Sequence, residues 1–502
     1  MINGNALIFQ GTNRRTNSND LVGWGFAGIQ FAANAGAFVI NGNSIFLNGS
    51  IVNNSTNSQT INLSAITINA TREINSNTAN IAINSVIQGA GGLAKAGSGT
   101  LTLSGNNSYT GPTSLTAGTV VIGNPAALGT SGNVSFTGGG LQFGTGITTD
   151  ISSRIKNSNS AILVDTNGNN ETFSDIIDSS NSGGLTKEGN GTLTLAGSNN
   201  FTGGVSLNTG TVVIGHANAA GSGPITQTDG TSLLTFDTTG TIANAMSIYN
   251  VSTNKTVTLS GGITVNNAEF DVASGETLTI SNTINGTGGV TKNGAGTLVL
   301  SGNNTYSAPT VINAGTLEAA NANALGSNNT VQVTGGTLLV TADEALAGKN
   351  IELSTSTLGL KISGNYSGAI GNLTLSANSS LDLGNGSVQI LIQGLALNSY
   401  FLSIYNWSGT PLLHGGNGND TDKVYILPSI TPEDLNKISF YSGDYGTDSF
   451  LGTGFDLGLQ PTNFSSSSGY HIIPVPEPET WATGILLLLG GAIWLLHSKK
   501  AV

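Results

Sequence analysis

The sequence contains no cysteine and little charge. Without cysteine the chain can form neither disulfide bonds nor thiolate metal sites, which suits a long protein that avoids thiol chemistry during export. Asp, Glu, Lys and Arg make up 8% of the residues, against about 25% in an average protein. The net charge of −12 comes from 15 basic and 27 acidic residues. A surface of this sign repels phosphate backbones and argues against nucleic acid as a partner.

The polar character comes instead from Asn, Ser and Thr, which recur along nearly the whole chain together with 72 glycines. The apolar share of 38% argues against disorder for most of the length. Uncharged polar residues mixed with Val, Ile and Leu favour sheets with one dry and one wet face. The composition therefore predicts an elongated all-β protein.

Internal repeats organise the chain. Three segments align without gaps, and each is followed at the same distance by a second short strand. The segments are GGLAKAGSGTLTLSGNNSYTG at 91–111, GGLTKEGNGTLTLAGSNNFTG at 183–203 and GGVTKNGAGTLVLSGNNTYSA at 288–308. Looser alternating runs lie between them at intervals of about 8 to 12 residues, a spacing typical of all-β folds with regular turns.

Each residue class in the motif has a structural role. Leu101 and Leu103 are expected to point inward, while the intervening threonine points outward. Glycines at the corners, in 97–99 and at Gly105, are expected to supply positive φ. Tyr109, Phe201 and Tyr306 recur at one place and are expected to cap an edge of the core. Lys95, Lys187 and Lys292 are expected to be corner residues of the motif and not a binding stripe.

The motif resembles the autotransporter-associated β-strand repeat, which covers residues 91–123, 183–215 and 288–320. The resemblance implies a parallel β-helix in a family made largely of surface adhesins and large structural proteins, many without enzymatic activity. We predict an all-β, right-handed parallel β-helix (solenoid) over residues 1–389. At about 20 to 25 residues per coil, it would form roughly 15 to 19 coils.

Residues 390–474 differ from the repeats because aromatic and acidic residues concentrate there. We expect this region to be an atypical C-terminal cap or linker, since terminal repeats of solenoids must be atypical. Thr431 is expected to cap a short helix that starts at Pro432 with acids in its first turn.

The last segment, 475–502, contains an apolar run over 481–496 that ends in lysines. At about 1.5 Å per residue this run would span about 24 Å, somewhat less than the hydrocarbon core of about 30 Å. A short transmembrane helix with its C-terminus in the cytoplasm is expected. The predicted anchor residues are Trp481, Ile485, Leu486, Leu487, Leu488, Leu489, Ile493, Trp494, Leu495, Leu496, Lys499 and Lys500.

The same segment resembles the PEP-CTERM sorting signal, through its proline-flanked motif, a tryptophan, the apolar run and the basic end. The motif residues are Val475, Pro476, Glu477, Pro478 and Trp481. The resemblance implies that an exosortase handles the protein in a Gram-negative-type envelope, often together with extracellular polysaccharide. We expect an anchor that is at least transient, followed by display on the outer surface or secretion. Residues 1–20 show no signal peptide, which suggests a truncated gene product or a misplaced start.

Sites for chemistry are few. The four histidines lie far apart in the sequence and indicate no metal cluster. Two loops carry the oxygen ligands that calcium prefers, although solvated turns are the better interpretation of both. The calcium candidates are Asp165, Asn167, Asn169 and Glu171 in the first loop and Asp420 and Asp422 in the second. No other cofactor is predicted.

Taken together, these patterns predict a non-enzymatic surface or secreted repeat protein, acting in adhesion or in envelope or extracellular-matrix structure. The alternative is a β-helix polysaccharide lyase or glycoside hydrolase. Such enzymes use acidic and basic residues from neighbouring coils, and these coils contain few of either.

Overall fold

The computed structural model describes residues 4–407, 422–427, 432–442, 449–456 and 470–475. Within it, short strands with alternating burial are the basic unit. In β14 (Thr100–Leu103) the two leucines are buried and the two threonines half-buried, so the predicted inward direction of Leu101 and Leu103 is confirmed. These leucines stack on equivalent aliphatic residues of the coils before and after. A continuous apolar column forms in this way.

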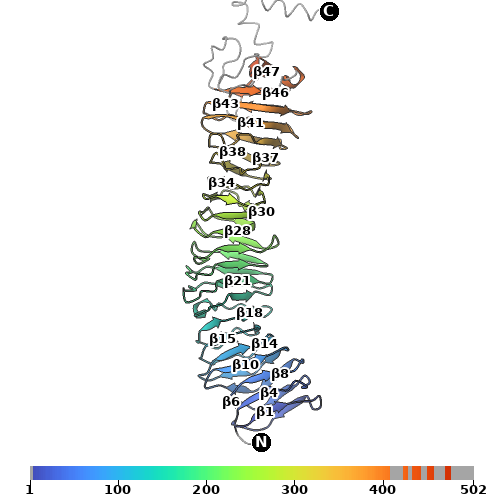
Figure 1. Cartoon of the computed structure of the whole chain (residues 1–502), viewed down its shortest axis with the longest axis vertical. Coiled ribbons are helices and arrows are strands. Elements are labelled where there is room, and N and C mark those ends of the chain that lie inside the picture. Colours follow the sequence, from blue (N-terminus) through green and yellow to red (C-terminus); the bar gives the residue numbers. More distant parts are fainter. Residues whose placement is uncertain (1–3, 408–421, 428–431, 443–448, 457–469, 476–502) are drawn as a thin grey trace, which may run out of the picture. The chain divides into compact units, whose positions relative to one another are not determined.

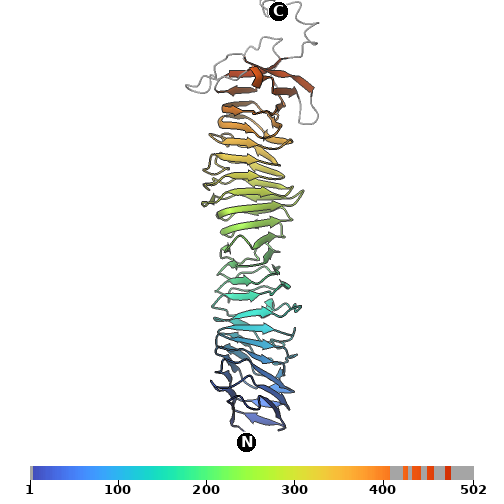
Figure 2. The ribbon, with the colours of Figure 1, turned by 90° about the vertical axis from the view of Figure 1, so that its right-hand side faces the viewer.

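The chain divides into two compact units, Met1–Val257 and Thr258–Val502. The fold is an all-β solenoid of the right-handed type with about 19 turns, which confirms the solenoid part of the expected fold class; the expected transmembrane helix lies outside the described residues. Figures 1 and 2 show strands of successive coils stacked side by side within each unit. The boundaries expected at 389 and 474 remain predictions.

The first unit begins with three parallel ladders, one for each face of the coil. The first ladder contains β1 (Ala6–Phe9), β4 (Gly28–Phe31), β7 (Ile51–Asn53), β10 (Arg72–Ser76), β13 (Leu93–Ala96), β15 (Thr113–Leu115) and β17 (Val134–Phe136). The second contains β2 (Thr16–Asn19), β5 (Val39–Gly42), β8 (Gln59–Leu63), β11 (Ile81–Ile83), β14, β16 (Thr119–Ile122) and β18 (Gly140–Phe143). The third contains β3 (Trp24–Phe26), β6 (Ile45–Leu47), β9 (Ala65–Thr67) and β12 (Val86–Gln88).

The coils are reorganised after β18, around the 3-10 helix η1 (Ser152–Arg154). β18 pairs with β19 (Ile162–Asp165), which pairs with β21 (Leu185–Glu188) of the second repeat. That ladder continues through β23 (Val205–Leu207), β25 (Ile225–Gln227) and β28 (Met246–Thr253). Beside it run β20 (Asn170–Phe173), β22 (Thr192–Leu195), β24 (Thr211–Ile214) and β26 (Leu233–Phe236).

Two long parallel ladders make up most of the second unit. One contains β30 (Ile263–Val272), β33 (Val290–Asn293), β35 (Thr310–Ile312), β37 (Thr330–Val333), β39 (Asn350–Leu353), β41 (Tyr366–Leu375), β43 (Val388–Ala396) and β45 (Lys423–Ile426). The other contains β31 (Thr277–Ile280), β34 (Thr297–Leu300), β36 (Thr316–Ala319), β38 (Thr337–Val340), β40 (Leu358–Ile362), β42 (Ser379–Asp382), β44 (Leu402–Tyr405) and β46 (Ile438–Ser442).

Strand pairing becomes antiparallel at the end of the second unit. β47 (Ser449–Asp456) pairs with β46, and β48 (Tyr470–Val475) pairs with both β47 and β45. Short helix α1 (Pro432–Leu435) starts at the proline with two acids in its first turn, as predicted. The predicted cap residue Thr431 lies outside the described residues. Outward-facing Tyr405 and Tyr441 stack with ring centroids 4.7 Å apart, so their ring faces cover each other.

Candidate functional site

The three repeat lysines point into the coil and are buried. Each ammonium group donates to three backbone carbonyls, two in its own corner and one in the next coil. The acceptors are Ala96, Gly97 and Ala117 for Lys95 (2.8, 2.7 and 3.0 Å), Glu188, Gly189 and Thr209 for Lys187 (2.9, 2.6 and 3.2 Å), and Asn293, Gly294 and Ala314 for Lys292 (2.5, 2.7 and 3.2 Å). Burial lowers the pKa of each lysine to about 8. The lysines themselves lie within strands β13, β21 and β33, so their expected position at the corners is wrong, but their ammonium groups hold the corner carbonyls and join adjacent coils.

A buried asparagine in each repeat bridges three successive coils. Its side-chain oxygen accepts from a backbone N–H of the preceding coil, and its amide donates to a carbonyl of the following coil. The pairs are Ile87 and Ala127 for Asn107 (2.8 and 2.6 Å), Ile177 and Ala219 for Asn199 (2.8 and 2.7 Å), and Ile284 and Ala324 for Asn304 (2.8 and 2.6 Å). Such asparagines therefore join three successive coils, with Ile87 and Ile284 at short strands and Ile177 outside any strand.

A third corner interaction was missed by sequence reasoning, because its donor lies outside the repeat motif. After each repeat, a side chain of the following coil donates to backbone carbonyls at or near one glycine, which is Gly129, Gly221 or Gly326. The donors are Arg154 at Leu128, Gly129 and Gly132 (2.6, 3.0 and 2.8 Å), Asn244 at Gly221 and Gly223 (3.0 and 2.6 Å), and Lys349 at Gly326 and Asn328 (2.7 and 2.6 Å). Because the donor is Arg, Asn or Lys, alignment of the repeats alone gives no common residue type.

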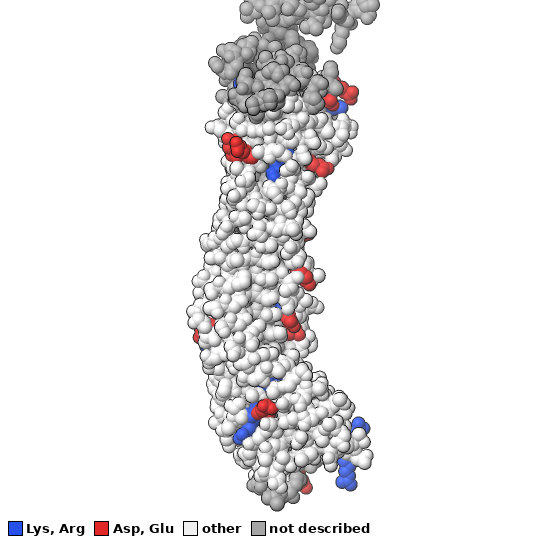
Figure 3. Space-filling model, in the orientation of Figure 1, with Lys and Arg blue, Asp and Glu red and all other residues white. Residues whose placement is uncertain are grey.

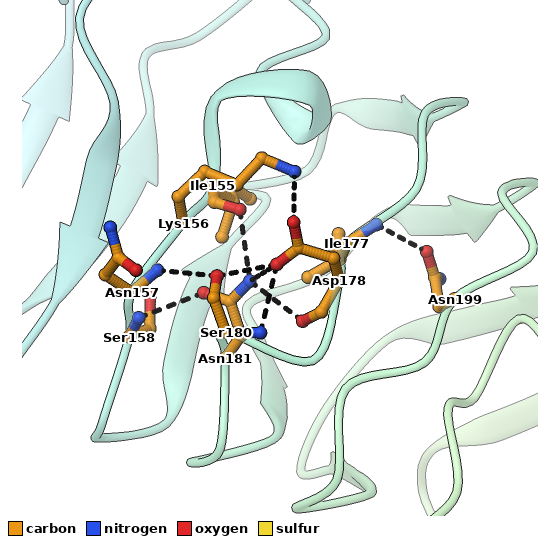
Figure 4. Close-up of polar contacts among 9 residues, drawn as sticks. All are labelled: Ile155, Lys156, Asn157, Ser158, Ile177, Asp178, Ser180, Asn181 and Asn199. Carbon is orange, nitrogen blue, oxygen red and sulfur yellow. Dashed lines mark hydrogen bonds and ion pairs between the residues drawn. The ribbon is translucent and has the colours of Figure 1, made fainter.

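Another polar corner is shown in Figure 4. Lys156 and Asp178, both partly exposed, form an ion pair of 2.8 Å. Buried Asn181 accepts from the backbone N–H of Ser158 at 3.0 Å and donates to the Ile155 carbonyl at 3.1 Å. The polar groups of this cluster form hydrogen bonds and an ion pair with one another, and in this way they hold successive coils together.

The first calcium candidate loop uses its oxygens to shape turns. The Asp165 carboxylate accepts from the Asn167 N–H at 2.8 Å and from Gln142 at 2.6 Å. Asn169 accepts from the Gly146 N–H at 2.8 Å. In contrast to these residues, Glu171 lies in β20 and points into the coil. The predicted residues therefore do not converge on one point, and solvated turn is the better interpretation of Asp165 to Asn169.

In the second candidate loop, Asp420 lies outside the described residues. Asp422 is buried, and its carboxylate accepts from the Val388 N–H at 2.9 Å. Across the described part of the chain, no group of three or more His, Asp or Glu side chains is arranged to hold a metal ion.

The outward faces carry rows of uncharged polar side chains. Asn84 donates to Asn62 at 2.8 Å, and Asn62 donates to Asn41 at 3.1 Å, across three successive coils. On another face Gln88 donates to Thr67 at 3.1 Å. Figure 3 shows that uncharged residues cover most of the visible face within each unit. These ordered amide and hydroxyl rows are the best candidate contact surface.

Of the predicted sorting motif, Val475 is described as the last residue of β48, where it pairs with Thr453. Pro476, Glu477, Pro478 and the predicted anchor 481–496 lie outside the described residues, as do the two lysines that follow it. Within the described ranges, no helix has the length and apolarity needed to cross a bilayer.

Comparison with known proteins agrees with the repeat geometry. Residues 93–122, 185–214 and 290–319 match the passenger-associated-transport-repeat. The chain therefore carries autotransporter-associated repeats. It is also 31% identical over 308 residues, 56% of its length, to the adhesin BmaC autotransporter of Brucella suis biovar 1 (strain 1330), and the match covers 9% of that protein. No solved structure matches the chain.

Each matched repeat contains one lysine corner, one bridging asparagine and one buried aromatic ring. The residues that the three matched segments share are therefore ones that hold coils together. The outward row of Asn41, Asn62 and Asn84 lies outside the matched residues.

Proposed function

We propose that this chain belongs to a non-enzymatic surface protein that acts in adhesion or in envelope or matrix structure. The observation that carries the proposal is the set of outward amide and hydroxyl rows, such as Asn41, Asn62 and Asn84, held at the fixed spacing of a parallel sheet. Many weak contacts of this kind give multivalent attachment to a hydroxyl-rich surface such as a glycan. Similarity to an adhesin supports the same role.

The full chain, immobilised on a sensor and exposed to a panel of bacterial and host polysaccharides, tests this function. Binding without a change in polysaccharide length is expected. A triple change of Asn41, Asn62 and Asn84 to Ala should weaken binding, while Lys255→Met, an exposed change elsewhere, should not. Shortened polysaccharide products, detected by size-exclusion chromatography, would instead support the lyase or hydrolase alternative and refute a purely adhesive role.

We further propose that segment 475–502 addresses the protein to an exosortase in a Gram-negative-type envelope. Support comes from the order of its parts: Val475 to Pro478, Trp481, the apolar run and Lys499–Lys500. In a host with an exosortase, a tag placed after Val502 should be lost from the wild-type protein. Replacement of Pro476, Glu477 and Pro478 by Ala should preserve the tag. Equal tag loss in both proteins would refute this address.

A further inference from the structure

Loop 144–151, which follows β18, is fastened to the next coil by side chains. The Gly146 N–H donates to the Asn169 side chain at 2.8 Å, and the Thr149 N–H donates to Glu171 Oε2 at 3.2 Å. Asp150 in turn accepts from the backbone N–H of Ser174 at 2.9 Å and from its hydroxyl. The backbone N–H of Ile147 donates within the loop, to Gly144. The attachment therefore depends on the state of these side chains.

Glu171 occupies an inward position that aliphatic residues fill in the following coils. It is in register with Leu193, which is in register with Val212. Its side chain is only 2% exposed, and Oε1 has no hydrogen-bond partner. A buried carboxylate with a single backbone donor is costly when it is ionised.

The surrounding groups shift the pKa values of two neighbouring acids, Asp150 and Glu171, in opposite directions. Burial opposes ionisation of Asp150, but hydrogen bonds from Ser152 and Ser174 outweigh it and lower the Asp150 pKa. For Glu171, burial raises the pKa to about 7, the Thr149 N–H lowers it, and the Asp150 charge raises it further. In the other ladder of these coils, β19 carries Asp165 and β21 carries Lys187 and Glu188, while β22, which pairs with β20, presents Leu193 to Glu171.

We propose that Glu171 is a proton-dependent latch, which fastens loop 144–151 while it is protonated and lets the loop open more often once it ionises. In the closed loop, an ionised Glu171 would lie near the Asp150 charge with one oxygen unsatisfied. Opening gives that carboxylate access to water. The proposed latch concerns only the opening of loop 144–151, and it does not depend on what the outer faces of the solenoid bind.

The direction of the pH effect follows from linkage. In the open loop Glu171 titrates near its ordinary value of 4.5, and in the closed loop near 7. Between these values the closed loop holds the extra proton, so the ratio of closed to open falls by up to about tenfold per pH unit. Below about pH 4.5 the latch is fully effective, and above about pH 7 no further loosening occurs. The total change is on the order of a hundredfold.

Hydrogen exchange of the full chain between pH 4.5 and 8.5, corrected for intrinsic exchange rates, tests the latch. Peptides that cover 144–151 should show a roughly hundredfold rise in opening up to about pH 7 and a plateau above it. Peptides that cover β22 should show no such rise. Glu171→Gln, which cannot ionise, should remove the pH dependence, whereas Glu188→Gln in the next coil should preserve it.

The latch is refuted if Glu171→Gln retains the wild-type pH dependence, or if β22 opens with the same profile as 144–151. Circular dichroism establishes whether Glu171→Gln folds. If it does not, the wild-type comparison of 144–151 with β22 alone decides, since a global pH effect would change both segments equally.

Discussion

The hydroxyl groups of Tyr109 and Thr113 lie 2.7 Å apart and are fully buried. The third repeat has the same pair in Tyr306 and Thr310, at 2.6 Å. In the second repeat both hydroxyls are missing, because the equivalent positions hold Phe201 and Val205. The two positions therefore change together, as a buried polar pair requires: removing one partner leaves the other unsatisfied.

This relationship predicts a non-additive pair of substitutions. Tyr109→Phe should lower the free energy of unfolding by about 1–3 kcal/mol, because the buried Thr113 hydroxyl loses its partner. Tyr109→Phe combined with Thr113→Val recreates the second repeat and should recover most of that loss. Urea denaturation of the four proteins in a double-mutant cycle measures the coupling. Additive losses would show that the hydroxyl pair contributes nothing.

The bridging asparagines should be far more sensitive than the exposed ones. Asn107→Ala removes bonds to Ile87 and Ala127 and leaves two buried backbone groups unpaired. A loss of about 2–4 kcal/mol in the free energy of unfolding is expected. Asn84→Ala, which removes one exposed side-chain bond to Asn62, should cost less than about 0.5 kcal/mol. Similar losses for the two variants, measured by urea denaturation, would contradict the bridging role.

The sequence predicts the fold well because the repeated information is local. Alternation around Leu101 indicates an inward-facing strand, and the glycines at 97–99 indicate the corner before it, without any knowledge of coil neighbours. Gly105 shows where this local reasoning fails. The sequence predicts positive φ at both corners of the motif, and Gly97 in the first corner has it, but Gly105 in the second corner does not. Gly105 is required for space, since a Cβ there would lie 2.1 Å from the Ser85 carbonyl oxygen.

The same limit applies to the polar contacts. Arg154 and Lys349 contact carbonyls more than 20 residues away in the preceding coil, and no spacing within one repeat indicates them. Glu171 looked like a loop ligand because it follows Asn167 and Asn169. Its inward direction becomes evident only when β20 is placed in register with Leu193. Contacts between coils depend on register, which sequence alternation alone does not define.

The buried lysines predict how stability changes at alkaline pH. The folded chain releases the Lys95 proton near pH 8, whereas an unfolded lysine retains it to about 10.5. Between these values the unfolded state binds more protons, so stability rises with pH. Lys95→Met removes one such contribution, and its deficit relative to wild type should widen by about 1–2 kcal/mol from pH 7.5 to 9.5.

Urea denaturation at the two pH values measures that deficit. Lys255→Met, at an exposed position, is the matched control and should keep a constant difference from wild type. If the deficit of Lys95→Met is constant as well, the Lys95 ammonium group of the wild-type protein titrates in the folded chain as it does in the unfolded chain.

Substitutions at Gly129 and Gly146 distinguish the cost of backbone strain from the cost of a steric clash. Their φ angles are nearly equal, at 71° and 72°. A Cβ at Gly129 would lie 2.3 Å from the Tyr109 carbonyl oxygen, whereas a Cβ at Gly146 would meet nothing within 4 Å. Gly146→Ala should therefore cost about 1–2 kcal/mol, the ordinary cost of a side chain in this conformation. Gly129→Ala adds a clash with backbone and should cost more than about 4 kcal/mol.

Thermal and urea denaturation of both variants measure the two costs. Because the strain from positive φ is common to them, their difference reports how tightly successive coils approach at the Tyr109 corner. Equal losses would mean that this corner can shift to accept a methyl group. In that case the coil-to-coil spacing at Gly129 would not be fixed by the buried aromatic ring and the carbonyl beside it.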